Sequence, residues 1–257
     1  MSYLENISYA LKIAKGEIPG TAQISKFGRL TNIDTGDTFP KDLWNGDAVY
    51  SGFPTGAAET MEIFSSDAND TSAGTGAREV VVRNLLDENG VLMPDITVAL
   101  NGTTPVSLGA QTYSRCSRVW VSDVGSGEAN AGEITLRHTT TTTNIFALMP
   151  IGFNATSIMA YTVPAGSTLY VKRGNISLIR TSGSPGSGTA TVRSREYGST
   201  VFVSNRVIDI ATGFPYKFEN NGFMVFSART DLKVTVENVS DNDTSIASDF
   251  DGYLIED

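Results

Sequence analysis

Residues 78–106 read REVVVRNLLDENGVLMPDITVALNGTTPV, and this stretch decides the fold class. A β-rich run leads into the polar turn DENG, and a second apolar run ends at Asn-Gly, residues 101–102. In the second run Val98 and Leu100 share one face and small or polar residues share the other, which is the period of a half-buried strand. Asn and Gly tolerate the positive φ that a tight hairpin turn needs. The stretch therefore predicts strand, turn, strand and turn.

Strand and turn signals of this kind recur almost to the C-terminus and predict an all-β protein. The domains we expect are a helix and extended arm over 1–60, a β-sandwich over 61–150 and a second, jelly-roll-like β-sandwich over 151–257. About eight short strands in the last hundred residues suit a jelly roll. The predicted strands are 61–64, 79–85, 96–100, 118–122, 133–137, 145–149, 161–163, 169–172, 176–180, 189–195, 201–204, 207–210, 216–218, 224–226, 232–236 and 250–255.

The N-terminus predicts a helix. Ser2 and Glu5 have the spacing of a capping box, and Gly16 is placed to end the helix in a left-handed turn. A helix of about 14 residues is marginal alone, so its apolar stripe needs a surface in its own domain or on a neighbouring subunit. The stripe consists of Leu4, Ile7, Leu11 and Ala14.

Between residues 17 and 60 glycines and prolines interrupt every regular pattern, yet large aromatic residues occur at intervals. A structureless segment this long is unusual within a compact domain, so we expect an extended arm that docks at discrete points. The arm could wrap around its own core or lie across a neighbour in an assembly. The anchors expected for an intersubunit contact are Phe27, Phe39, Trp44, Tyr50 and Phe53.

Composition excludes several function classes. The 257-residue chain has a net charge of −9 and no run of Lys or Arg, so it is not expected to bind nucleic acid. It shows no secretory signal and no apolar run long enough to span a membrane, and we expect a soluble protein made in a reducing cytoplasm. Its single cysteine, Cys116, allows no intrachain disulfide. Arg115 and Arg118 could lower the thiol pKa, but a small apolar strand residue is the favoured interpretation.

No pattern indicates an enzyme, a cofactor or a metal site. His138 is the only histidine, and it precedes a run of threonines, which indicates the end of a strand rather than a catalytic base. No phosphate-binding glycine motif or nucleophile elbow is present. Two acidic groups resemble parts of a cation loop, but each also fits an ordinary turn or a solvated strand edge. These groups are Asp67, Asn69 and Asp70, and Asp249, Asp251, Gly252 and Glu256.

Turn-forming segments along nearly the whole chain after Gly16 resemble a broad group of tailed-bacteriophage virion structural proteins. This resemblance implies a role in virion assembly and names no catalytic residue. The segments are ISKFG (24–28), NIDT (32–35), DLW (42–44), FPTG (53–56), SSDANDT (65–71), AGTGAR (73–78), LNGTTPV (100–106), NAGEI (130–134) and YTVPAG (161–166).

Three functional hypotheses follow. The first is a capsid decoration or cement protein that bridges neighbouring capsid subunits, with the major capsid protein, other virion proteins or further copies of the chain as partners. Many weak copies stabilise a shell through avidity. The second is a tail, head–tail connector or fibre-anchoring protein. The third is a glycan-binding or receptor-binding virion protein. Each implies localisation in the virion after assembly in the host cytoplasm.

Overall fold

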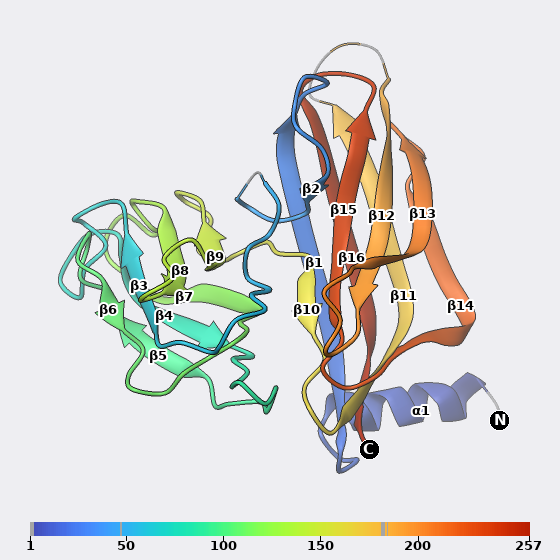
Figure 1. Cartoon of the computed structure of the whole chain (residues 1–257), viewed down its shortest axis with the longest axis horizontal. Helices are drawn as coiled ribbons and strands as arrows, with labels where there is room; N and C mark the ends of the chain where they lie inside the picture. The colour runs from blue at the N-terminus through green and yellow to red at the C-terminus, as the bar shows by residue number, and fades with distance from the viewer. Residues whose placement is uncertain (1–2, 47, 181–182, 184) are drawn as a thin grey trace.

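The computed structural model describes residues 3–46, 48–180, 183 and 185–257, without the side chains of 3–8 and 220–222. Within these residues the protein is all-β apart from one N-terminal helix, which confirms the all-β part of the predicted fold class. Figure 1 shows two bodies side by side, a large sandwich of long strands and a small lobe of short ones. Each body has its own hydrophobic core.

The large sandwich consists of two antiparallel sheets. One sheet has the order β1 (Thr21–Ile33), β16 (Thr244–Glu256), β11 (Ser167–Arg180) and β14 (Tyr216–Phe226). The other has the order β10 (Ala160–Thr162), β15 (Asp231–Val239), β12 (Ser187–Arg195) and β13 (Val203–Ala211), and β2 (Lys41–Asp42) also pairs with β15. The strands pair in a nested way, β1 with β16, β10 with β15, β11 with β14 and β12 with β13.

The small lobe also contains two sheets. One has the order β6 (Val106–Ser107), β3 (Met61–Ser65), β8 (Ile134–His138) and β9 (Ile145–Met149). The other has the order β5 (Ile96–Ala99), β4 (Ala77–Arg83) and β7 (Arg118–Val124). Strands β4 and β5 are antiparallel, with Val80 opposite Val98, and Val98 and Leu100 are buried as predicted. Gly102 has a φ of +60°, which the turn after β5 requires.

The two cores divide the chain at other places than the predicted domain boundaries. The large core contains Leu30 and Leu43 together with residues from Met159 onward, and the small core begins at Trp44 and ends at Ala160. The small lobe is therefore inserted into the large sandwich between β2 and β10. Both ends of the chain build the large sandwich (Figure 1).

The prediction of an arm without regular structure over 17–60 is wrong for β1. This strand has thirteen residues and pairs along most of its length with β16. Its buried face carries Lys26 and Gly28 beside Leu30, so the apolar alternation that marks a strand is hidden in the sequence. A Cβ on Gly28 would meet the Met159 backbone nitrogen at 2.3 Å, and only glycine fits there.

Several predicted short strands merge into longer ones. The segments 169–172 and 176–180 form the single strand β11, which contains a register shift between Val171 and Arg173. The segments 201–204 and 207–210 similarly join within β13, and 216–218 and 224–226 are the ends of β14. A β-bulge interrupts the hydrophobic alternation without ending the strand, so these strands look broken in the sequence.

The predicted helix is present as α1 (Tyr3–Ala14), and Gly16 has the expected positive φ of +70°. Within the described side chains, Ile13 is buried and Leu11 is 51% exposed. The helix therefore packs on its own chain through Ile13, and Leu11 and Ala14 on the predicted stripe face outward. The side chains of Leu4 and Ile7 lie outside the described residues.

Candidate functional site

A cluster of hydrogen-bonded side chains lies where the two bodies meet, around Asp231. Antiparallel register places Thr162, Asp231 and Arg195 opposite one another on β10, β15 and β12. Arg115 reaches the same carboxylate from a loop of the small lobe and donates from Nε to Oδ1 at 2.9 Å and from Nη2 to Oδ2 at 3.0 Å. A salt bridge therefore joins the two bodies.

Five hydrogen bonds converge on the Asp231 carboxylate. Arg195 donates to Oδ2 from Nε at 3.1 Å and from Nη2 at 2.5 Å, and Thr162 Oγ1 donates to Oδ1 at 2.6 Å. The Asp231 side chain is only 4% exposed. Burial opposes ionisation of this carboxyl, but the hydrogen bonds from Arg115, Thr162 and Arg195 and the charge of Arg115 prevail and hold its pKa below the ordinary value. We call Asp231, Arg115, Arg195 and Thr162 the interlobe clamp.

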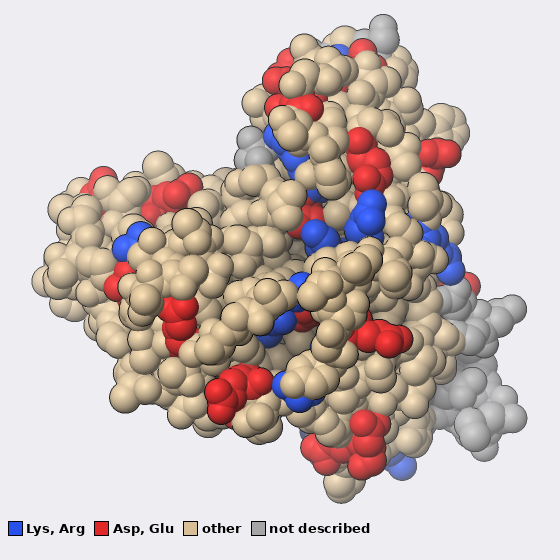
Figure 2. Space-filling model, viewed as in Figure 1, with Lys and Arg blue, Asp and Glu red and all other residues tan. Residues whose placement is uncertain are grey.

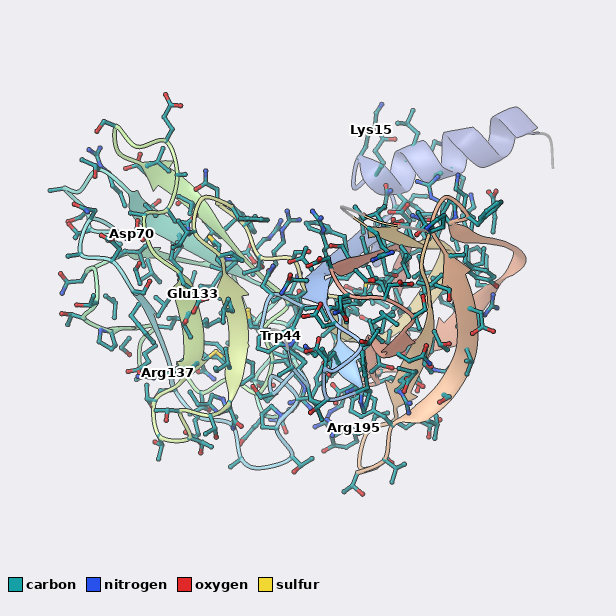
Figure 3. All side chains as sticks on the ribbon, turned by 90° about the horizontal axis from the view of Figure 1, so that it is seen from above. Lys15, Trp44, Asp70, Glu133, Arg137 and Arg195 are labelled. Atoms are coloured by element: carbon teal, nitrogen blue, oxygen red, sulfur yellow. The ribbon has the colours of Figure 1, made fainter. Side chains whose placement is uncertain are left out.

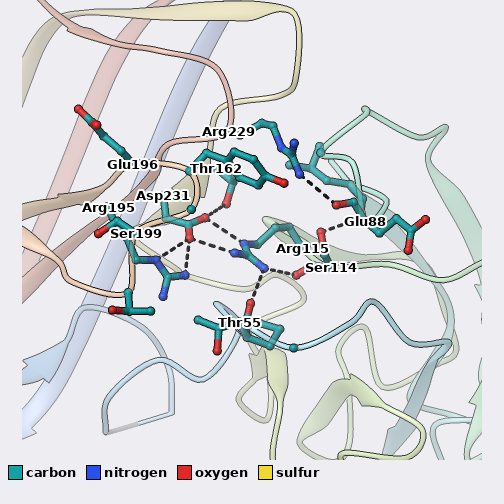
Figure 4. A pocket seen from close by; sticks show the side chains of 17 residues that line it. Thr55, Glu88, Ser114, Arg115, Thr162, Arg195, Glu196, Ser199, Arg229 and Asp231 are labelled. Atoms are coloured by element: carbon teal, nitrogen blue, oxygen red, sulfur yellow. Dashed lines mark hydrogen bonds and ion pairs between the residues drawn. The ribbon is translucent and has the colours of Figure 1, made fainter.

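The clamp forms the base of a cleft of about 410 Å³ between the two bodies (Figure 4). One wall comes from the loop after β12, where Tyr197 is 65% exposed. The Arg229 guanidinium lies 3.2 Å from the centre of the Tyr197 ring and donates to the Glu88 carbonyl oxygen at 3.2 Å. Thr55 from the segment before β3 lines another part of the cleft. Residues from both bodies thus enclose it.

Lys26 makes a second polar link between the bodies. It is buried on β1 and donates from Nζ to the carbonyl oxygen of Ser117 in the small lobe. Burial lowers the pKa of the Lys26 amine to about 7. At neutral pH this side chain is therefore partly uncharged, which reduces the cost of keeping it between the bodies.

The predicted anchors have other roles than contacts with a neighbour. Trp44, Tyr50 and Phe53 are buried in the small-lobe core, so their assignment as intersubunit anchors is wrong. Trp44 packs edge-on against Tyr50 at 5.1 Å, and Tyr50 packs against Phe53 at the same distance. Figure 3 shows Trp44 at the junction of the two bodies. These three large rings therefore pack within their own chain, in the small-lobe core, and not against another subunit.

The other two predicted anchors differ from these three. Phe39 is half-buried against the large core. Phe27 lies on the outer face of β1, is 41% exposed, and carries the Arg118 guanidinium 5.1 Å from its ring centre. Of the five anchors, Phe27 has the most accessible ring.

Neither of the two conspicuous reactive residue types is placed for catalysis. His138 is fully buried, with Nε2 2.9 Å from the Tyr113 carbonyl oxygen and Nδ1 3.2 Å from Asn144. Burial raises the pKa of the Cys116 thiol to about 12, so at neutral pH it is protonated and a poor nucleophile. A hydrogen bond from the thiol to the Arg118 carbonyl oxygen opposes this rise in pKa, but burial prevails.

Asp70 fixes a long turn of the small lobe. Its buried carboxylate accepts hydrogen bonds from Ser65 Oγ at 2.6 Å and from the Ala77 nitrogen at 2.6 Å. Two further bonds come from the nitrogens of Ala131 and Gly132, both at 2.8 Å. This ordinary-looking turn residue thus joins two loops that are 61 residues apart.

The second acidic group lies on β16. Asp251 makes an ion pair with Arg173 at 2.6 Å across the sheet, and Asp249 lies opposite Asn175. Among the described residues no group of three or more His, Cys, Asp or Glu side chains is arranged to hold a metal ion. Within the same residues, no helix has the length and apolar character needed to cross a membrane.

No protein-family model matches this chain, and no curated protein matches it. One similar solved structure is that of infectious bursal disease virus Gx strain. Its chain is 11% identical in sequence, and the match covers 92% of this chain and 72% of that chain with a TM-score of 0.26. Infectious bursal virus derived T=1 particles are 12% identical, cover 92% and 78%, and have a TM-score of 0.13. These TM-scores are too low to show a shared fold.

Proposed function

We propose that this protein is a structural component of a virus particle, with the large sandwich as a jelly roll. The nested pairing of β1, β10, β11 and β12 with β16, β15, β14 and β13 supports this most strongly. It gives eight strands in two sheets, the arrangement of a jelly roll, which occurs in viral capsid and lectin domains. The resemblance to tailed-bacteriophage virion proteins favours the first of these classes.

Within the particle we propose a capsid decoration role, supported by exposed apolar residues on β13 and in the turn after it. Figure 1 shows β13 and β14 on the side of the sandwich opposite the small lobe. Strands β13 and β14 are free edges of their sheets. Val203 and Val207 on β13 are exposed, and Phe214 in the turn after it is 78% exposed. Exposed apolar residues grouped in this way mark interaction surfaces. The partners would be the major capsid protein, other virion proteins or further copies of this chain.

Quantitative mass spectrometry of purified particles tests this function. A decoration protein is expected in hundreds of copies, in proportion to the major capsid protein. Six to a few dozen copies would instead support a tail, connector or fibre-anchoring role. Absence from the particle would refute both structural roles.

A pair of matched variants tests the surface. Phe214→Asp places a charge on the proposed contact side and is expected to reduce occupancy on purified shells. Phe153→Asp makes the same change at a phenylalanine that is 59% exposed on the small lobe, and full occupancy is expected. Equal occupancy for the two variants would contradict the proposed surface.

A further inference from the structure

We propose that the interlobe cleft binds a carboxylated saccharide, such as a uronic acid unit of a surface polysaccharide. The cleft has about 410 Å³, within the range of pockets that hold small ligands. Its base is cationic, its wall carries an exposed aromatic ring, and hydroxyl groups lie between them. The site depends on the geometry of the two bodies and not on a role in a particle.

The base of the cleft is cationic because the clamp contains two arginines and only one carboxylate. Two guanidinium groups, from Arg115 and Arg195, share the single carboxylate of Asp231, so one positive charge remains uncompensated. The carboxylates of Glu88 and Glu196 also line the cleft, but Figure 4 shows both side chains directed away from the clamp. A ligand carboxylate would meet the positive end of the cleft without facing these two groups.

A free hydrogen-bond donor is available at this base. Arg195 uses Nε and Nη2 for Asp231 and Nη2 for the Phe53 carbonyl oxygen at 3.1 Å. Among the described residues no hydrogen bond reaches its Nη1. Arg195 lines the cleft with a side chain that is 8% exposed, and Nη1 is the nitrogen of its guanidinium that is left for a ligand. Arginine is the residue best suited to bind a carboxylate through its planar donors.

The rest of the wall suits a sugar ring. Arg229 lies over one face of Tyr197, and the ring remains 65% exposed. This contact holds the ring in place without burying it, which leaves an apolar face for stacking. Thr55, Ser199 and Thr200 supply hydroxyl groups to the same cleft. Figure 2 shows basic side chains gathered around the middle of this face of the molecule, although the whole protein is acidic.

Isothermal titration of the whole chain with tetragalacturonate, cellotetraose and inorganic phosphate tests the proposal. Tetragalacturonate is expected to bind at least about tenfold more tightly than the neutral cellotetraose, because only the former carries carboxylates for the cationic base. Inorganic phosphate is expected to compete weakly, because it cannot stack on Tyr197. Equal binding of the two oligosaccharides, or binding of neither, would overturn the proposal.

Variants outside the clamp show whether binding occurs in the cleft. Tyr197→Ala is expected to weaken tetragalacturonate binding by about tenfold, and Tyr197→Phe to leave it nearly unchanged because the ring is kept. Phe214→Ala removes an exposed ring that does not line the cleft, and wild-type binding is expected. Equal affinities for Tyr197→Ala and the wild type would place the ligand elsewhere and refute the site. A protein absent from particles could still pass this test, so the two proposals fail separately.

Discussion

Replacing Asp231 by asparagine is expected to destabilise the protein more than any single change elsewhere in the clamp. The substitution keeps the shape of the side chain but removes the negative charge with which both Arg115 and Arg195 are paired. Both guanidinium groups are mostly buried, with exposed fractions of 16% and 8%, so neither can be compensated by water alone. Removing one partner of a buried ion pair costs about 3–5 kcal/mol. A domain of ordinary stability would lose a large part of its total from this change.

The variant Arg115→Met provides a comparison in which we expect a smaller loss of stability than for Asp231→Asn. It leaves Asp231 paired with Arg195 and hydrogen-bonded to Thr162, so no buried charge is stranded. The expected cost is about 1.5–3 kcal/mol, the range for hydrogen bonds to charged groups. The order of stability should therefore be wild type, Arg115→Met and Asp231→Asn.

Urea denaturation can measure these costs with two probes. The only tryptophans are Trp44 and Trp120, and they report on the joint and on β7 of the small lobe, whereas circular dichroism reports on all strands. Where two variants have the same dependence of unfolding free energy on urea concentration, their stabilities are compared through the urea concentrations at the unfolding midpoints. A loss of less than about 1 kcal/mol for Asp231→Asn would refute the view that removing this carboxylate leaves costly unpaired charges buried in the clamp.

The pH dependence gives a second check on the same clamp. Because the pKa of Asp231 is lowered in the folded protein, its contribution to stability is present above the unfolded pKa of about 3.9 and is lost as pH falls through the folded pKa. The stability difference between wild type and Asp231→Asn should therefore stay constant from pH 8 to about pH 5 and decline only below about pH 4. A difference that already falls between pH 7 and pH 6 would contradict the assignment to this carboxyl.

Two further predictions concern other buried charges. Asp70→Ala leaves the donors of Ser65, Ala77, Ala131 and Gly132 without their acceptor and should cost at least about 3 kcal/mol by urea denaturation, whereas a cost under about 1 kcal/mol would show that the turn reorganises freely. For Lys26, whose pKa is lowered to about 7, the unfolded chain binds more protons between about pH 7 and pH 10.5, so wild-type stability should rise with pH there by up to about 1.4 kcal/mol per unit. Lys26→Met should flatten that rise, and parallel stability curves for the two proteins would contradict it.

Sequence periodicity predicted the strands whose buried positions are apolar and failed where they are not. The strand β5 was predictable from Val98 and Leu100, because both of these buried residues are aliphatic. On β1 the equivalent positions include Lys26 and Gly28. Lys26 is buried because its amine donates a hydrogen bond to the Ser117 carbonyl oxygen, and Gly28 is required because the Met159 backbone lies too close for a side chain. Both requirements come from tertiary contacts, which local patterns do not contain.

The interlobe clamp could not be found from the sequence for a similar reason. Thr162, Asp231 and Arg195 are far apart in the chain and meet only because three strands pair in one register. Arg115 then joins them from an inserted lobe. One signal was available, namely Asp231 at the start of an apolar strand, but alone it resembles an ordinary turn residue.

The insertion also explains why the aromatic residues were misassigned. The covalent connections between the lobe and the large sandwich are the two chain segments after β2 and before β10. Side-chain contacts must therefore fix the two bodies relative to each other. Phe53 in the segment after β2 contributes to this, because its ring centre lies 5.6 Å from that of Phe202, between β12 and β13, and 5.9 Å from the Arg195 guanidinium on β12. Aromatic spacing in the sequence therefore identified a real docking segment but assigned it to the wrong partner, because burial within one chain and burial between chains select the same residues. Exposed residues such as Phe214 and Val207, which the core does not need, are the better basis for proposing a contact with another protein.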